Sequence, residues 1–205
     1  MNNLNKLTLT SAFVLSALVP SQAFAATLVS TSVMGSSTPT ITNAASVQNG
    51  DFTITSIWGN RVGDGEDEVT SWKFNFNSPS IIGNVTKALV DLDLKPLSLF
   101  ETDTFEIAGI GSLQFTDFLP LNQAKYNQTQ SVQIDLLKFF SPGTILTAFN
   151  NSGGSLQASY GDDAILSFAK MTLEAESVDV PEPATTFGLL TLVGLGSTFL
   201  AKRKS

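Results

Sequence analysis

Apolar and polar residues alternate along most of the middle of this 205-residue chain. In residues 72–77, three aromatic residues alternate with one lysine and two asparagines. The same alternation recurs in residues 52–58, 88–94, 105–115, 132–136 and 164–176. A period of two residues places apolar side chains on one face of a β-strand and polar side chains on the other. The middle of the chain therefore predicts sheets with one buried face.

Turn-forming residues separate these alternating segments. Asn, Asp, Ser, Gly and Pro cluster at residues 49–50, 63–65, 78–79, 141–143 and 150–154. Short strands joined by such turns favour an all-β fold, a single antiparallel β-sandwich or jelly roll, over residues 26–179. We find no helical periodicity in this part of the sequence, and we expect residues 119–130 to form a polar connection.

The N-terminal segment has the features of a secretory signal peptide. Lys6 precedes an apolar stretch from residue 7 to residue 19, and Pro20 ends that stretch. Ala23 and Ala25 then form an A-x-A site, so we expect signal peptidase to cut after Ala25. The apolar stretch is short for a bilayer span, which favours a signal peptide over an uncleaved anchor.

The C-terminal segment has the length of a membrane span. Residues 184–201 carry no charge, and as a helix they would rise about 27 Å, close to the thickness of a hydrocarbon core. Lys202, Arg203 and Lys204 follow, and such cations favour the cytoplasmic side. We therefore expect a transmembrane helix in the inner membrane with the preceding domain outside the cytoplasm, as the signal peptide also requires.

Pro181, Glu182 and Pro183 stand just before this apolar span. The Pro-Glu-Pro motif, the single span and the basic end resemble the PEP-CTERM sorting signal of Gram-negative bacteria. The resemblance covers residues 180–205 and is confined to this tail. It implies processing near the motif by an exosortase, a membrane cysteine peptidase, and association with the cell surface and the exopolysaccharide matrix. The alternative is a plain C-terminal anchor.

Composition narrows the chemistry open to the middle domain. Once the charged residues of the two ends are set aside, 7 basic and 17 acidic residues remain, a net charge of −10. Such a domain would be repelled by phosphate backbones, so we expect no nucleic-acid partner. The chain has no cysteine and no histidine, which excludes Ser-His-Asp and Cys-His catalysis and the usual zinc ligand sets. We expect the protein not to be an enzyme.

One short acidic segment is a candidate calcium site. Asp64, Glu66, Asp67 and Glu68 place four carboxylates within five residues. The segment does not fit an EF-hand loop, and a solvated hairpin turn is the alternative reading. Nearby Trp58 is a candidate for stacking on a ligand, because it lies next to a glycine-rich turn.

Other notable side chains are expected to be structural. Trp72, Phe74 and Phe76 have the spacing of core residues. Three acidic pairs could support acid–base chemistry, but we expect them on the exposed face of a sheet or in a turn. These pairs are Asp91 with Asp93, Glu101 with Asp103, and Asp162 with Asp163.

Three functions compete for this sequence. The sorting tail and the β-sandwich pattern favour a non-enzymatic structural or adhesive protein of the cell envelope or extracellular matrix. The alternative is a carbohydrate-binding β-sandwich module, assisted by calcium, with exopolysaccharide as its partner. A glycoside hydrolase is the third reading, and it would need two carboxyl groups about 5–10 Å apart across a cleft.

Overall fold

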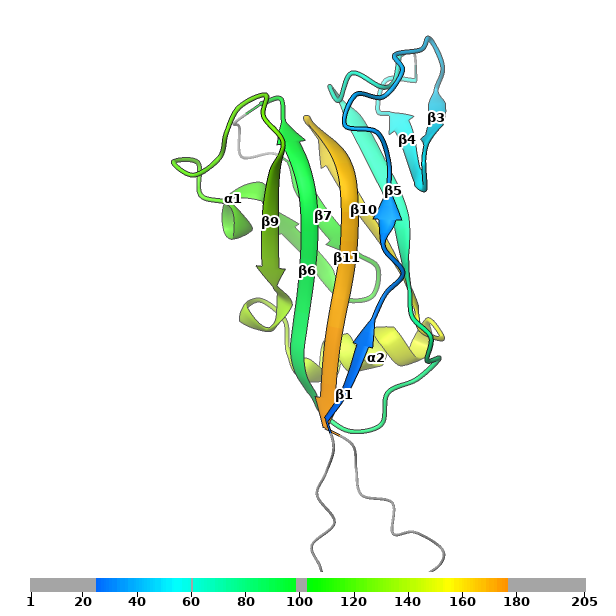
Figure 1. The fold of residues 1–205 in the computed structure, drawn as a ribbon, viewed down its shortest axis with the longest axis vertical. Helices are drawn as coiled ribbons and strands as arrows, with labels where there is room; N and C mark the ends of the chain where they lie inside the picture. Colours follow the sequence, from blue (N-terminus) through cyan, green and yellow to red (C-terminus); the bar gives the residue numbers. More distant parts are fainter. Residues whose placement is uncertain (1–24, 60, 99–102, 177–205) are drawn as a thin grey trace, which may run out of the picture. The chain divides into compact units, whose positions relative to one another are not determined.

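The computed structural model describes residues 25–59, 61–98 and 103–176, which form two antiparallel β-sheets (Figure 1). The first sheet has the strand order β1–β11–β6–β9, and β2 also pairs with β11. Its strands are β1 (Ala25–Val29), β2 (Val33–Met34), β6 (Val85–Pro96), β9 (Gln130–Asp135) and β11 (Ala164–Glu176). The second sheet has the order β3–β4–β5–β10–β7–β8. Its strands are β3 (Ser46–Asn49), β4 (Phe52–Ser56), β5 (Glu68–Asn75), β7 (Thr104–Ile107), β8 (Gly111–Gln114) and β10 (Ser155–Asp162).

The alternation in the sequence determines which side chains enter the core. In β5, Trp72 and Phe74 are buried, whereas Lys73 between them faces solvent. In β6, Leu92 and Leu94 are buried in the same way. Buried apolar residues from both sheets form one continuous core. Each fully buried Val, Leu, Ile, Phe or Met side chain in it contributes about 1.5–3 kcal/mol to folding. The predicted all-β fold with antiparallel sheets packed as a sandwich is therefore confirmed.

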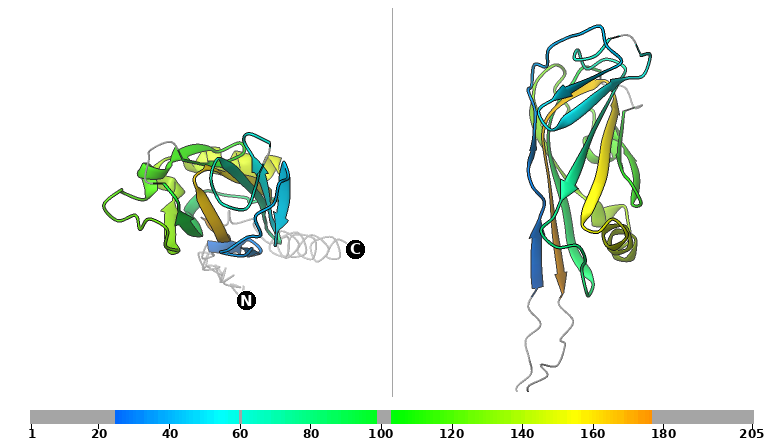
Figure 2. Two further views of the ribbon diagram at one scale, coloured as in Figure 1. Left: turned by 90° about the horizontal axis from the view of Figure 1, so that it is seen from above. Right: turned by 90° about the vertical axis from the view of Figure 1, so that its right-hand side faces the viewer.

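The two ends of the described domain lie side by side. β1 pairs with β11 so that Ala25 lies opposite Glu176, and Figure 2 shows these two strands running together. Ala25, the last residue of the predicted signal peptide, is thus the first residue of β1. The rest of the predicted signal peptide, the Pro-Glu-Pro motif and the apolar tail lie outside the described residues. Within the described ranges, no helix combines the length and apolar character that a membrane crossing requires.

The expectation of no helix in the middle of the chain was wrong. Helix α2 (Pro142–Asn151) lies across one end of the sandwich (Figure 1), and shorter helical turns occur at α1 (Phe115–Phe118) and η1 (Leu136–Lys138). Ser141 caps α2 by accepting a hydrogen bond from the backbone N–H of Thr144 (3.1 Å). A serine followed by a proline is typical of turns as well as of helix starts. The residues at 141–143 therefore indicate a turn in the sequence, although in the structure they begin a helix.

One predicted strand is in fact a hairpin. Residues 105–115 contribute β7 and β8, which pair with each other across a tight turn at residues 108–110. Gly109 has a φ of 81°, a backbone conformation that glycine adopts without strain. The glycines that suggested a bend therefore reverse the chain. Residues 119–129 form turns without strand or helix, as predicted for a polar connection.

Candidate functional site

The acidic segment 64–68 lies in the loop that leads into β5. Glu68, the first residue of that strand, is 3% exposed. Its Oε1 atom accepts hydrogen bonds from the backbone N–H groups of Gly63 and Asp64. Burial raises the pKa of Glu68, and the nearby Asp64 adds to the rise, while the N–H of Gly63 opposes it. The Glu68 carboxylate therefore holds the loop together from inside.

The other carboxylates of the segment point to different partners. Asp64 forms an ion pair with Arg61, with Oδ2 2.9 Å from Nε. Glu66 and Asp67 are exposed, and the backbone N–H of Asp67 donates to Oδ1 of Asp163 (3.1 Å). The four residues predicted as one calcium site are thus divided between separate contacts.

One carboxylate of the segment, that of Asp67, instead lies close to two carboxylates from the end of β10 and the turn after it. Asp67, Asp162 and Asp163 can each place one carboxylate oxygen within 4.8 Å of the others. The pairing of β5 with β10 explains this, because it sets Asp162 opposite Glu68. The sequence singled out both segments but not the register that joins them. Calcium binding at this end of the domain stays a prediction.

The structural role of Glu68 gives a testable expectation. Glu68→Ala leaves two backbone N–H groups without an acceptor and should lower the free energy of unfolding by about 2–4 kcal/mol. Glu68→Gln keeps an accepting oxygen and should cost less than about 1 kcal/mol. Urea denaturation measures both. Glu66→Ala, in the same loop but exposed, is the matched control and should stay within about 0.5 kcal/mol. An equal effect of the two alanine variants would refute the structural role.

Trp58 lies on the surface of the same loop region. Its side chain is 72% exposed, unlike Trp72 and Phe74 in the core. It lines a shallow hollow of about 240 Å³ together with Ser56, Arg61, Asp64, Glu66 and Asp67. Trp58 is therefore accessible, as a stacking residue must be. The residues around it form a shallow hollow rather than an enclosed ligand site. The prediction that Trp72, Phe74 and Phe76 pack in or against the core is confirmed.

The acidic pairs of the sequence have different environments. Asp91 and Asp93 lie on the outer face of β6, as expected, where Gln133 donates to Asp91 (2.8 Å) and Ser131 to Asp93 (2.6 Å). Lys170 also forms an ion pair with Asp91 (3.3 Å). These two carboxylates are therefore engaged with neighbouring strands.

Asp103 contradicts the expectation of an exposed acidic pair. It is 1% exposed, and its Oδ2 accepts a hydrogen bond from the Tyr160 hydroxyl (2.9 Å). Burial raises the pKa of Asp103 to about 6, the charges of Asp162 and Asp163 add to the rise, and the Tyr160 hydrogen bond opposes it. The prediction was wrong because Asp103 lies against β10 rather than on a free sheet face. Glu101, its partner in the sequence pair, lies outside the described residues.

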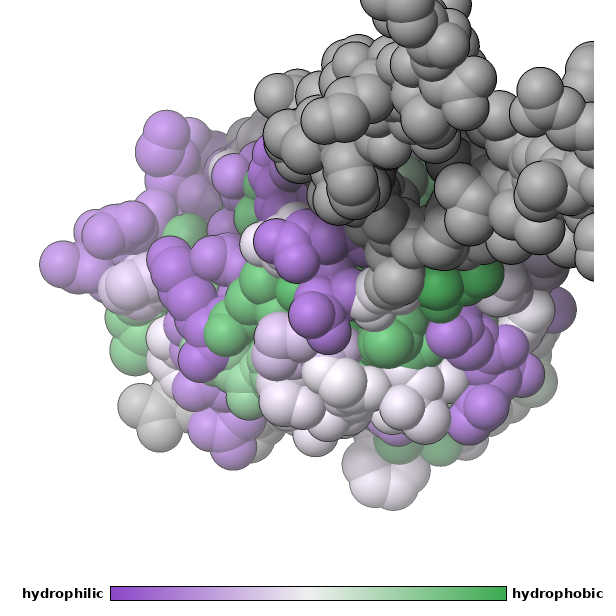
Figure 3. Space-filling view, turned by 90° about the horizontal axis from the view of Figure 1, so that it is seen from below, coloured by the Kyte–Doolittle hydropathy of each residue, from purple (hydrophilic) through white to green (hydrophobic). Residues whose placement is uncertain are grey.

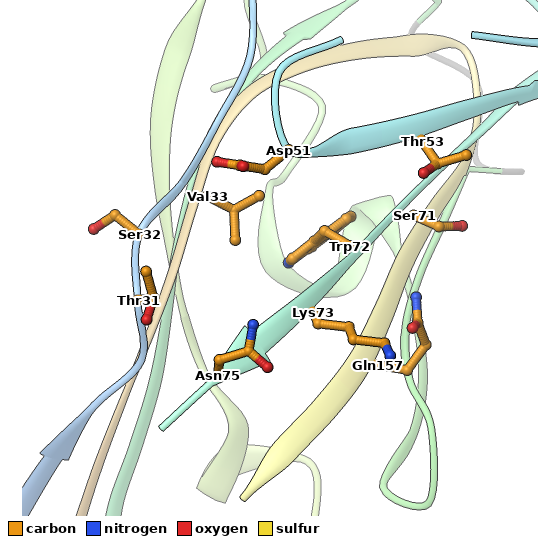
Figure 4. Close-up of a pocket in the computed structure, with 10 residues that line it drawn as sticks. All are labelled: Thr31, Ser32, Val33, Asp51, Thr53, Ser71, Trp72, Lys73, Asn75 and Gln157. Atoms are coloured by element: carbon orange, nitrogen blue, oxygen red, sulfur yellow. The ribbon is translucent and has the colours of Figure 1, made fainter. Parts of the chain in front are cut away.

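A polar hollow beside the core was not predicted. It measures about 360 Å³ and lies along the edge of β5, between the start of β4 and the segment that joins β1 to β2 (Figure 4). At one end Thr53 pairs with Ser71, and at the other the N–H of Thr31 donates to the carbonyl of Asn75 (2.7 Å). The lining residues are Thr31, Ser32, Val33, Asp51, Thr53, Ser71, Trp72, Lys73, Asn75 and Gln157. We call this hollow the β5-edge pocket.

Trp72 forms part of the floor of the β5-edge pocket. The residue is 3% exposed and packs against Phe52, Phe74 and Phe105. Its indole nitrogen is buried and has no hydrogen-bond partner among the described residues. In Figure 4 this nitrogen is turned toward the side of the pocket where Thr31 and Asn75 lie. The sequence placed Trp72 in the core correctly, but no local pattern reveals that its polar atom is left unpaired.

Elsewhere on the domain the surface is mixed in character. The space-filling view from below shows polar residues around a few small apolar areas (Figure 3). Such small areas are usual on soluble domains. Among the described residues on this face, no single large apolar patch stands out.

The comparisons with known proteins concern the fold and the tail separately. A search of the curated proteins gave no match to this chain. Among solved structures, the chain is similar to the C-terminal CBM6 of LamC, a marine laminarinase from Zobellia galactanivorans. The identity is 9%, the match covers 70% of this chain and 98% of that chain, and the TM-score is 0.29.

The C-terminal tail matches a sorting signal. Residues 179–204 match the model of the PEP-CTERM protein-sorting motif. The match includes Pro181, Glu182 and Pro183, on which the resemblance in the sequence was based, and so confirms it. The motif implies export and sorting to the cell envelope. The chain is therefore a protein that carries the PEP-CTERM sorting motif at its C-terminus.

Proposed function

We propose that this protein is an exosortase-sorted component of the cell surface or extracellular matrix with a non-enzymatic, structural or adhesive role. The observation that carries the proposal is the PEP-CTERM motif at residues 179–204. In this proposal signal peptidase removes residues 1–25, the apolar tail holds the precursor in the inner membrane, and exosortase cuts near Pro181–Pro183. The β-sandwich is the part that is displayed.

The chemistry of the described domain supports a non-enzymatic role. The chain lacks histidine and cysteine, which removes the Ser-His-Asp triad and the Cys-His dyad. Asp91 and Asp93 are engaged with neighbouring strands, and Glu68 holds backbone N–H groups. Asp103 is buried against Tyr160. These carboxylates have structural partners, which favours a binding or structural domain over a hydrolase with two free carboxyl groups facing a cleft.

A charge in the apolar tail tests the membrane step of this proposal. In a host that carries an exosortase, Leu192→Arg should disfavour insertion by about 2.5–3.5 kcal/mol. The variant should therefore leave the membrane fraction and accumulate as unprocessed precursor, as seen by alkaline extraction and immunoblotting. Leu192→Ile keeps the apolar character and should fractionate like the wild type. Identical fractionation and processing of the Arg and Ile variants would contradict the proposal.

A further inference from the structure

The β5-edge pocket contains a hydrogen-bond donor that the fold leaves unused. The Trp72 indole N–H is buried at the floor of the pocket and finds no acceptor among the described residues. A buried donor without an acceptor costs about 1–3 kcal/mol. A phenylalanine would supply the aromatic packing against Phe52 and Phe105 without that cost. An oxygen of a bound molecule at the floor of the pocket would satisfy the donor.

The walls of the pocket supply both donors and acceptors. Lys73 can only donate and the Asp51 carboxylate can only accept, and in Figure 4 these two residues lie on either side of Trp72. The amide of Gln157 and the hydroxyls of Thr31 and Ser32 can do both. A ligand that satisfies such a lining must itself donate and accept at several closely spaced positions. The hydroxyl groups of a saccharide have this property.

The charge and size of the pocket further restrict the class of ligand that it can bind. One carboxylate and one ammonium group line it, so their formal charges balance and a neutral ligand is favoured over an anion. The domain around it is strongly acidic, which also disfavours an anionic ligand. The volume of about 360 Å³ lies at the lower end of the range for small-molecule sites, about 300–1,000 Å³. The pocket is therefore suited to one or two sugar units rather than to a long enclosed chain.

We infer that the β5-edge pocket binds a unit of a neutral saccharide, with the Trp72 N–H donating to a ring or hydroxyl oxygen at its floor. Lys73 and Gln157 form one wall, and the Lys73 side chain extends toward Gln157 (Figure 4). Asp51 accepts from a sugar hydroxyl on the opposite wall. This inference rests on the proposed function and deepens it, because it identifies the surface by which a displayed domain would adhere to matrix polysaccharide.

Tryptophan fluorescence can test this inference on the full chain. The sequence has two tryptophans, so Trp58→Phe leaves Trp72 as the only one. The purified chain, in a detergent without a sugar headgroup, is titrated with neutral disaccharides of glucose, mannose and galactose and with a uronic-acid disaccharide. We expect at least one neutral sugar to shift the emission of Trp72 with a Kd of about 1 mM or tighter. Calorimetry then gives affinities for variants without depending on fluorescence.

Two variants separate the pocket from general effects on folding. Trp72→Phe removes the N–H and should weaken binding at least tenfold. Gln157→Ala alters only an exposed side chain and should weaken binding about 3- to 10-fold. Gln133→Ala, on the outer face of the other sheet, is the matched control and should bind like the wild type. The Gln157 variant keeps the test valid even if Trp72→Phe folds poorly.

Several results would overturn the inference. One is that no neutral sugar binds at about 10 mM, well above the expected Kd. Another is that only the uronic-acid disaccharide binds. Equal affinity of Gln157→Ala and Gln133→Ala, or loss of binding in Trp58→Phe, would place any sugar site elsewhere. Binding by the purified chain does not depend on processing. A negative result therefore leaves the sorting proposal standing, and a failure of sorting leaves the binding result intact.

Discussion

Replacing Asp103 with asparagine is expected to stabilise the protein by about 2–3 kcal/mol at pH 8 and to have little effect at pH 4. In the folded protein the pKa of Asp103 is raised to about 6 from an ordinary value of 3.8. Between these two values the folded state binds more protons than the unfolded state. The contribution of Asp103 to stability is therefore present below pH 4 and is lost as the pH rises through about 6. Asparagine resembles the uncharged form and can still accept from Tyr160.

The measurement is urea denaturation of both proteins at intervals from pH 4 to pH 8. The difference in unfolding free energy between Asp103→Asn and the wild type should increase from about pH 4 to about pH 6 and remain constant above that. Glu106→Gln, an exposed position on the neighbouring strand β7, is the control and should differ from wild type by less than about 0.5 kcal/mol. A destabilised Asp103→Asn protein at pH 8 would show that the buried carboxylate is favourable, contrary to our account.

Truncating Phe149 is expected to cost about 3–5 kcal/mol of unfolding free energy. Phe149 is fully buried on the inner face of α2. Its ring packs edge-on against the ring of Phe76, with 5.1 Å between the two ring centroids. Phe149→Ala removes this contact and leaves a cavity under the helix. Thr147→Ala, on the exposed face of the same helix, should change stability by no more than about 0.5 kcal/mol. Both are measured by urea denaturation, and a cost below about 1 kcal/mol for Phe149→Ala would exclude α2 from the cooperative core.

The parts of the fold that could be predicted are those that depend on local pattern. Alternation assigned Trp72 and Phe74 to the core and Lys73 to the surface because the strand period is fixed by backbone geometry. The same reasoning failed at α2, where Ile145, Ala148 and Phe149 provide only a short helical face. Ten residues give too few turns for the helical period to stand out from a turn signal.

The candidate sites could not be predicted because they depend on how distant segments meet. Asp67 meets Asp163 only through the register of β5 with β10, and Asp103 is buried because β7 pairs with that same β10. The β5-edge pocket exists because the pairing of β4 with β5 ends at Thr53 and Ser71. The segment after β1 contacts β5 only further along, where Thr31 donates to Asn75. No single segment carries this information. The sorting motif, in contrast, was predictable because the Pro-Glu-Pro residues, the apolar stretch and the terminal cations are contiguous in the sequence.

The most direct test of the account is mass spectrometry of the mature protein from its native host. We predict a form that begins at Ala26 and ends near Pro181–Pro183, and we predict that the full C-terminal tail accumulates when the host's exosortase is deleted. A mature protein that retains Ser205 in the presence of exosortase would show that the tail is a permanent anchor, and would contradict the proposed sorting and release.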